Sequence, residues 1–116
     1  MTTIATSMFD NISNMEKIDV LPGVKANFIS AEKLTIAYWY IDKGGIIPQH
    51  AHHHEQVVNC MSGEFEMTIG DETKVMTAGE VAIVPANVTH SAKALTQVHC
   101  IDIFTPVRED YMALLK

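Results

Sequence analysis

The sequence predicts an all-β protein, built as an antiparallel sandwich or a jelly-roll barrel. Three observations lead to this prediction. Short runs rich in β-branched and aromatic residues recur along the chain, turn residues separate them at short intervals, and no convincing helical period lies between them. A parallel sheet would need a helical crossover between successive strands, so this pattern argues against alternating βαβ units.

The first half of the chain predicts an irregular arm followed by strands. Residues 1–23 are mixed and polar without a clear period, and we expect a short N-terminal arm that ends at a Pro-Gly turn. Strands are predicted at residues 24–30 and 34–42, because both runs are rich in β-branched and aromatic residues. Two isoleucines then lead into Pro48 and a cluster of histidines, after which residues 56–61 predict the next strand.

The second half predicts closely spaced strands and a terminal helix. Residues 64–69 alternate polar and apolar side chains, as a half-buried strand does. Further strands are predicted at residues 73–76, 81–84, 90–95 and 97–104. Residues 108–116 predict a short C-terminal helix. With the run that leads into the histidines, the sequence predicts about nine strands.

The composition indicates one globular domain over residues 1–116. The chain has 47% hydrophobic and 19% charged residues, and a chain of this length buries roughly two-thirds of its unfolded surface. A formal net charge of −6 without a Lys/Arg cluster argues against nucleic acid as a partner. No apolar run approaches the roughly 18 residues of a membrane span, and we see no signal-peptide pattern, so we expect no membrane partner and a cytoplasmic location.

The chain contains two cysteines, Cys60 and Cys100. Each lies within a strand-like run. The commoner state of a cysteine in that setting is a buried thiol, so we expect free thiols rather than a disulfide.

One short stretch contains four of the six histidines. Imidazole nitrogens bind divalent transition metals, and residues two apart on a strand point to the same side, so His50 and His52 can share a metal. Gln56 and Glu55 are the nearby candidates for a third ligand, and parity in an extended chain favours Gln56. His90, which opens a strand after a Pro-containing loop, is the distant candidate.

The other two histidines of this stretch, His53 and His54, are expected beside the metal site or facing solvent. The alternative for the whole stretch is a set of polar loop side chains. Two histidines with strand spacing after a proline, and a third one downstream, favour the metal site.

The last predicted strand adds a carboxylate. The even-numbered side chains of residues 98–104 share one face, and Asp102 lies among apolar neighbours on it. Burying a carboxylate is costly unless a partner or a cation is near, and a metal in the barrel would supply the cation. The alternative places Asp102 on the solvent face with Ile101 and Ile103 in the core, and alternation alone does not decide between the two.

Arg108 is the only arginine of the chain and follows a proline after that strand. Its fork of N–H groups could hold a carboxylate bidentately. It could equally pair with Glu109 or Asp110 at the surface, which is the commoner fate of such a residue.

Two segments resemble the motifs of a known family. The spacing of Gly45, Pro48, His50, His52, Gln56 and Gly63 resembles the first cupin motif. The spacing of Gly79, Pro85 and His90 resembles the second cupin motif. The resemblance implies the cupin double-stranded β-helix, a jelly-roll barrel, with a short N-terminal arm and a short C-terminal helix. Two positions depart from the family pattern: the usual glutamate ligand is Gln56, and the usual glycine of the second motif is Asn87, which tolerates a positive φ better than most residues.

The glutamine changes the charge of the predicted site. Three imidazoles and an amide are neutral, so a divalent ion would keep its full +2 charge, which favours an anionic or oxygen-donor substrate. These donors do not select one metal, and Zn, Ni, Mn, Fe and Co all suit them.

A narrower resemblance involves the C-terminal part of the chain. Asp102 and residues 104–111, together with the His-x-His-x-x-x-Gln form of the metal motif, are similar to the KdgF-type cupins of pectin and alginate degradation. The resemblance implies a metal-dependent, isomerase-type enzyme that converts 4,5-unsaturated uronate monosaccharides, which are small anionic sugar acids, into linear keto forms. It implies metal ligands His50, His52, Gln56 and His90, with Asp102 and Arg108 as catalytic residues and Phe104 and Arg108 against the substrate.

Two other functions fit the same motifs, namely a dioxygenase-type cupin with a redox-active metal and a non-catalytic sugar-binding cupin. We also expect a homodimer. The outward residues of the last strand, His99, Ile101 and Ile103, include apolar surface that needs cover, and the N-terminal arm could add a strand to a partner's sheet edge.

Overall fold

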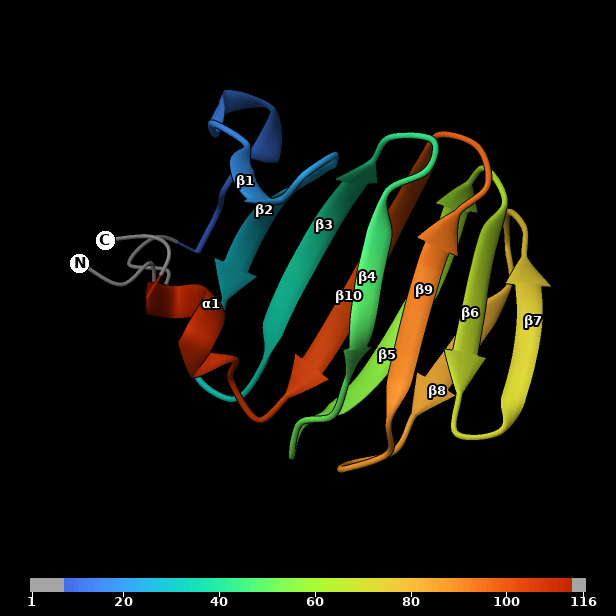
Figure 1. Cartoon of the computed structure of the whole chain (residues 1–116). Helices are drawn as coiled ribbons and strands as arrows, with labels where there is room; N and C mark the ends of the chain where they lie inside the picture. Colours follow the sequence, from blue (N-terminus) through green and yellow to red (C-terminus); the bar gives the residue numbers. More distant parts are fainter. Residues whose placement is uncertain (1–7, 114–116) are drawn as a thin grey trace.

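The structure, a computed structural model, describes residues 8–113 and consists of two antiparallel sheets that face each other (Figure 1). One sheet has the order β1-β2-β3-β10-β5-β8 and the other has the order β4-β9-β6-β7. The strands of the described part are β1 (Ile18–Leu21), β2 (Val24–Ser30), β3 (Thr35–Ile41), β4 (Ile46–His50), β5 (Glu55–Ser62), β6 (Phe65–Ile69), β7 (Glu72–Met76), β8 (Val81–Val84), β9 (His90–Ala94) and β10 (Val98–Thr105). A short 3-10 helix, η1 (Ile12–Asn14), precedes them, and α1 (Glu109–Ala113) follows. The predicted jelly-roll barrel is confirmed.

The segment before the first predicted strand is more ordered than the sequence indicated. Residues 18–21 form β1, which pairs with β2 of the same chain and places Asp19 opposite Lys25. The prediction of an irregular arm up to residue 23 was therefore wrong for this segment, because an alternation of four residues is too short to stand out. Residues 1–7 of the arm lie outside the described residues, as do residues 114–116 of the predicted C-terminal helix.

The inward face of β10 brings a carboxyl group into the barrel. β10 lies between β3 and β5 in the larger sheet, and its side chains alternate between buried and half-buried. The buried set is Val98, Cys100, Asp102 and Phe104, and the half-buried set is His99, Ile101 and Ile103. Of the two faces that the sequence left open for Asp102, the structure therefore has the inward one.

Apolar side chains from both sheets fill the space between them. The largest that are fully buried include Phe28 and Ile41 from the larger sheet, and Phe65 and Met67 are buried on the smaller one. Cys60 and Cys100 are buried free thiols that lie opposite each other on β5 and β10. The core thus extends along the barrel between the two sheets.

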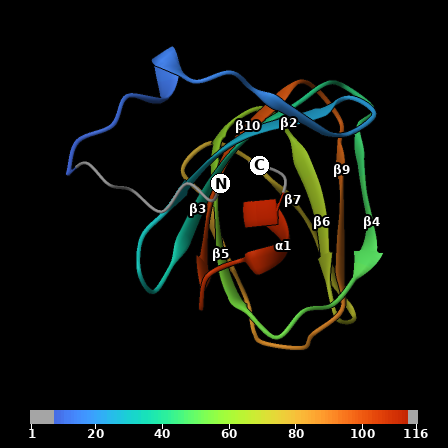
Figure 2. The same cartoon turned by 90° about the vertical axis from the view of Figure 1, so that its left-hand side faces the viewer.

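The short helix α1 covers one opening of the barrel and stands within the outline of the strands when the barrel is viewed end on (Figure 2). Tyr111 stacks on Phe28, with the ring centroids 4.7 Å apart, and packs edge-on against Trp39 and Phe104. Met112 is buried against the same core. The apolar side of this helix therefore closes the core at that end. None of the helices in residues 8–113 has the length and apolar character needed to cross a membrane.

Candidate metal centre and active site

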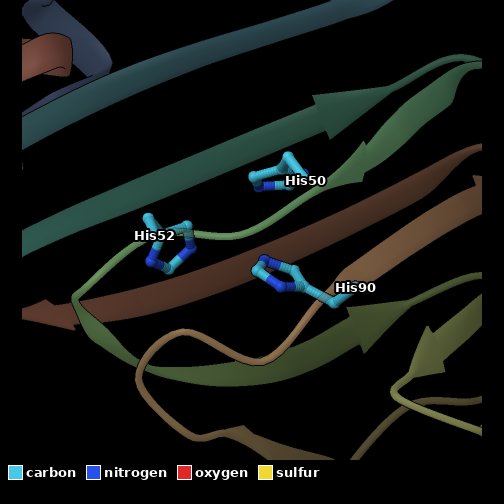
Figure 3. Close-up of side chains that lie close together, drawn as sticks. All are labelled: His50, His52 and His90. Atoms are coloured by element: carbon cyan, nitrogen blue, oxygen red, sulfur yellow. The ribbon is translucent and has the colours of Figure 1, made fainter.

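Three histidines meet inside the barrel, at the ends of two neighbouring strands and in the loop after one of them (Figure 3). His50 ends β4, His52 lies in the loop that follows, and His90 begins β9. Strand register sets His50 directly opposite His90, with ring centroids 4.2 Å apart, and the ring of His52 lies 4.9 Å from that of His90. One nitrogen of each ring lies within 4.8 Å of the corresponding nitrogens of the other two. The cluster has the donor types and the proximity that a transition metal requires.

Backbone carbonyl groups orient all three rings in the same sense. Nδ1 of His50 lies 2.8 Å from the Pro48 oxygen, Nδ1 of His90 lies 2.9 Å from the Val88 oxygen, and Nδ1 of His52 lies 3.1 Å from a loop carbonyl. A carbonyl oxygen only accepts, so each Nδ1 carries the proton and each Nε2 keeps its lone pair. This is the arrangement in which outer hydrogen bonds prepare a histidine to bind a metal. Nε2 of His90 is buried and has no hydrogen-bond partner among the described residues.

Gln56 adds an oxygen donor to the cluster. Its amide nitrogen donates to Oδ2 of Asp102 at 2.8 Å, so its Oε1 turns toward His52, whose Nε2 lies 3.1 Å away. With the His52 proton on Nδ1, both Nε2 of His52 and Oε1 of Gln56 are acceptors. Two lone pairs at that distance repel each other unless a cation lies between them. The residues present therefore fit a divalent metal held by His50, His52, His90 and the Gln56 oxygen.

The surroundings keep the imidazoles of His52 and His90 neutral, which is the form that binds a metal. Burial lowers the pKa of His52 to about 4, and the positive charge of Arg108 and the neighbouring His90 act in the same direction. Burial also lowers the pKa of His90. At neutral pH both rings are therefore free of the proton that would compete with a metal.

Asp102 is the acidic group of the site. It is 5% exposed, its Oδ2 accepts from Gln56, and its Oδ1 has no partner among residues 8–113. Burial raises the pKa of Asp102 to about 7, although the hydrogen bond from Gln56, the nearby Trp39 side chain and the charge of Arg108 act in the opposite direction. A carboxyl group with this pKa can both give and take a proton near neutral pH.

A pocket in the barrel joins these groups. Its polar lining includes His50, Gln56, His90 and Asp102. Its apolar walls include Trp39, Val58, Met67, Phe104 and Tyr111. Phe104, which the resemblance placed against the substrate, is one of the residues that line this pocket. A small polar group in a largely apolar pocket is the usual form of a small-molecule site.

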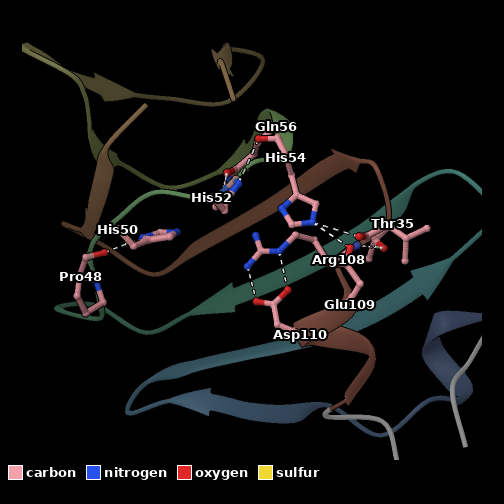
Figure 4. Close-up of polar contacts among 10 residues, drawn as sticks. Thr35, Pro48, His50, His52, His54, Gln56, Arg108, Glu109 and Asp110 are labelled. Carbon is pink, nitrogen blue, oxygen red and sulfur yellow. Dashed lines mark hydrogen bonds and ion pairs between the residues drawn. The ribbon is translucent and has the colours of Figure 1, made fainter. Parts of the chain in front are cut away.

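Arg108 is buried but does not reach the pocket lining (Figure 4). Its Nε and Nη2 donate to the two oxygens of Asp110 at 2.9 and 2.6 Å, and its guanidinium lies over the rings of Phe104 and Tyr111. The pairing with Asp110 that the sequence left open is thus present, although the arginine is not at the surface. Its bidentate fork is already occupied, so the expected bidentate grip on a carboxylate is not available, and only the buried Nη1 lacks a partner in the described part of the chain.

The loop that contains His52 and the loop that leads into His90 are also joined by a hydrogen bond. The backbone N–H of Asn87 donates to the His52 oxygen at 2.7 Å. Asn87 has a φ of 66°, in the left-handed region that asparagine tolerates better than most residues. The expectation that this asparagine replaces a glycine of the second motif in that backbone conformation is confirmed.

Comparison with known proteins identifies the family. Residues 37–104, which are more than half of the chain, match the Cupin domain family. The chain is a cupin. All four candidate ligands and Asp102 lie within the matched residues, whereas Arg108 and α1 lie beyond them.

Two curated proteins resemble this cupin in sequence. The pectin degradation protein KdgF of Dickeya dadantii is 28% identical over 93 residues, which are 78% of this chain and 84% of that protein. H2HPP isomerase of Bacillus subtilis is 42% identical over 67 residues, which are 55% of this chain but only 28% of that protein. The resemblance to KdgF covers most of both chains, and the resemblance to H2HPP isomerase covers a small part of the longer protein.

Two solved structures share the fold of this cupin. An RmlC-like cupin from Shewanella frigidimarina is 34% identical with a TM-score of 0.87, over 91% of this chain and 96% of that chain. KdgF from a Halomonas species is 27% identical with a TM-score of 0.86, over 91% of this chain and 99% of that chain. The cupin therefore has the architecture of small single-barrel relatives.

The pocket of this cupin also contains residues that the sequence reasoning did not assign. Trp39 and Tyr111 both line it, and the Trp39 side chain lies near enough to Asp102 to act against the rise in the pKa of that carboxyl group. The position of Trp39 could have been predicted from alternation along β3, because Trp39 shares a face with the buried Ile41. Tyr111 gave no such signal, because its position depends on how α1 folds back over the barrel.

Proposed function

We propose that this cupin binds one divalent transition metal through His50, His52, Gln56 and His90 and isomerises a 4,5-unsaturated uronate to its linear keto form. The observation that carries the proposal is the hydrogen bond from Gln56 to the buried Asp102, which links an acid–base group directly to the ligand cluster. The similarity over most of the chain to a pectin degradation protein supports the substrate class.

The reaction moves one proton and rearranges bonds within the sugar. The C1 hydroxyl loses its proton, a C1 carbonyl forms and the bond from C1 to the ring oxygen breaks. The enol that is released becomes a ketone at C5 when C4 gains a proton. Substrate and product therefore have the same atoms, and neither oxidant nor reductant is required.

Each side chain has a role that its position permits. Bound in the cluster, a metal ion supplies Lewis-acid stabilisation of negative charge on substrate oxygens. Asp102 takes the hydroxyl proton and delivers a proton to C4, because it lines the pocket, its Oδ1 has no partner among the described residues and its pKa is near neutral. Trp39, Phe104 and Tyr111 form apolar walls that exclude water from the enol.

The test is turnover of 4,5-unsaturated galacturonate by metal-loaded protein, followed as loss of the alkene absorbance. The substrate should disappear much faster with the loaded wild-type protein than with chelator-treated protein. A rate equal to that of the protein-free control would contradict the proposal. Oxygen consumption during turnover would instead indicate the dioxygenase alternative, and tight sugar binding without turnover would indicate a binding protein.

We also propose that the cupin forms a homodimer through the outer face of its larger sheet. Strand register aligns five β-branched residues in one row across that face: Ile29, Ile36, Ile103, Val57 and Ile83. A row that crosses the sheet can pack against the same row of a second copy related by a two-fold axis. A monomer mass by light scattering at micromolar concentration would contradict the homodimer.

A further inference from the structure

The segment after β10 forms a C-terminal cap, residues 106–113, that packs over one opening of the barrel (Figure 2). Tyr111 fixes its apolar side against Phe28, and Met112 is buried. Two of the pocket walls, Phe104 and Tyr111, also touch the guanidinium of Arg108, whose carbon lies 4.7 and 3.9 Å from their ring centroids. The position of this cap therefore shapes one wall of the pocket.

One histidine joins the cap to the loop that carries a candidate ligand (Figure 4). Nε2 of His54 lies 3.1 Å from the Val107 oxygen and 3.3 Å from Oε1 of Glu109. The backbone oxygen of the same residue accepts from Nδ1 of His52 at 3.1 Å. His54 thus contacts the ligand loop through its main chain and the cap through its side chain.

The two contacts of the His54 ring contribute unequally to the stability of the cap. His54 is 4% exposed, whereas the Glu109 side chain is 69% exposed, so water competes for the contact between them. The bond to the Val107 carbonyl is buried at the histidine, and a buried acceptor left without a donor is costly. Val107 immediately precedes Arg108, so this bond fixes the chain at the start of the guanidinium-bearing turn.

The ring proton of His54 also argues against a second metal at this place. His53, His54 and Glu109 have donor atoms within 4.8 Å of one another. Nε2 of His54 faces two acceptors, however, and must carry the proton to bond either. Nε2, the ring nitrogen that faces Glu109, therefore has no lone pair for a metal, and the remaining lone pair is on Nδ1, which is buried and has no partner in the described residues. The contacts that are present are those of Nε2 to the cap.

We infer that His54 is a positioning residue that holds the C-terminal cap, and with it Arg108 and Tyr111, in register with the metal-ligand loop. Its consequence for turnover rests on the proposed function, but its consequence for the cap does not. The geometry requires a donor at the position of Nε2, at the far side of the ring. A glutamine places its amide nitrogen near that position, whereas the shorter asparagine does not reach it.

The experiment compares His54→Gln with His54→Asn, and uses His53→Gln at the exposed neighbouring position as the matched control. Hydrogen exchange is measured at the amides of Arg108, which donates to Oγ1 of Thr35, and of Met112, which donates to the Arg108 oxygen. In His54→Asn both amides should lose about tenfold in protection, while β10 amides keep theirs. His54→Gln and the control should retain wild-type protection.

With 4,5-unsaturated galacturonate as the probe, His54→Asn should raise KM about tenfold and leave metal affinity unchanged, and His54→Gln should restore KM. Equal protection of the cap amides in His54→Asn and the wild type would overturn the inference, whatever the activity. An inactive wild-type protein that shows the expected exchange pattern would contradict the proposed function and leave the positioning role supported.

Discussion

The ligand cluster and the C-terminal cap lie against the same pocket but are held in different ways. Each of the three ligand imidazoles is fixed by a backbone carbonyl, and hydrogen bonds along the strands set His50 against His90. The cap is held by the packing of Tyr111 and Met112, by the bond from His54 to the Val107 oxygen, and by two carboxylates, Glu109 and Asp110, that are more than half exposed. The backbone of the barrel thus orients the candidate ligands, while the wall on the side of the cap depends on side-chain contacts, some of which are exposed. We expect changes in the two regions to separate metal binding from substrate binding.

The largest effect is expected in the ligand cluster. His90→Ala removes a buried donor whose Nε2 has no other partner in the described chain, so metal affinity should fall at least about 100-fold and turnover should be lost. Calorimetric titration with Zn²⁺ measures the affinity, with His53→Gln as the control at an exposed histidine. Wild-type affinity in His90→Ala would show that the cluster is not the metal site.

A change in the acid–base group should leave the metal in place. Asp102→Asn keeps the size of the side chain but cannot exchange a proton, so kcat should fall about 10²- to 10⁴-fold with metal affinity nearly unchanged. Steady-state kinetics on metal-loaded protein measures the effect. Retention of wild-type kcat would place the proton transfer elsewhere.

A change in the cap should have the opposite signature. Arg108→Lys keeps the charge but loses the fork that binds Asp110 and the planar contact with Tyr111. We expect KM to rise about tenfold while metal affinity stays at the wild-type level. The same titration and kinetics measure both quantities, and a fall in metal affinity as large as that of a ligand variant would remove the distinction between the two regions.

The smallest effect concerns the stability of the metal-free protein. The folded state raises the pKa of Asp102 from 3.8 to about 7 and so favours the protonated form. Its contribution to folding is fully present below the unfolded pKa and is lost as the pH rises through the folded one. Metal-free Asp102→Asn should therefore match the wild type near pH 4 and exceed its Tm by a few degrees at pH 8. A lower Tm than that of the wild type at pH 8 would show that neighbouring groups offset the cost of burying the charged carboxylate of Asp102.

Local pattern was sufficient to predict most of the barrel and the ligand cluster. Spacing after a proline nominated His50 and His52, and parity chose Gln56 over Glu55, because side chains on strands alternate regularly. The face of Asp102 could not be predicted, since β10 has apolar residues on both faces.

The remaining features depend on long-range packing. The contact of His54 with the cap joins residues more than fifty positions apart. The pairing of Arg108 with Asp110 is local, but the burial of the arginine depends on how the chain after β10 packs on the barrel. The short strand β1 was missed because its four residues gain their order from pairing with β2.

The most direct test of the central claim is turnover of 4,5-unsaturated galacturonate in D₂O by metal-loaded protein, with the product followed by proton NMR. If Asp102 delivers the proton inside the pocket, the product should have one deuterium at C4, on a single face of that carbon. Consumption of the substrate with deuterium on both faces equally would show that the enol leaves before it is protonated. That result, or the absence of turnover, would contradict the account.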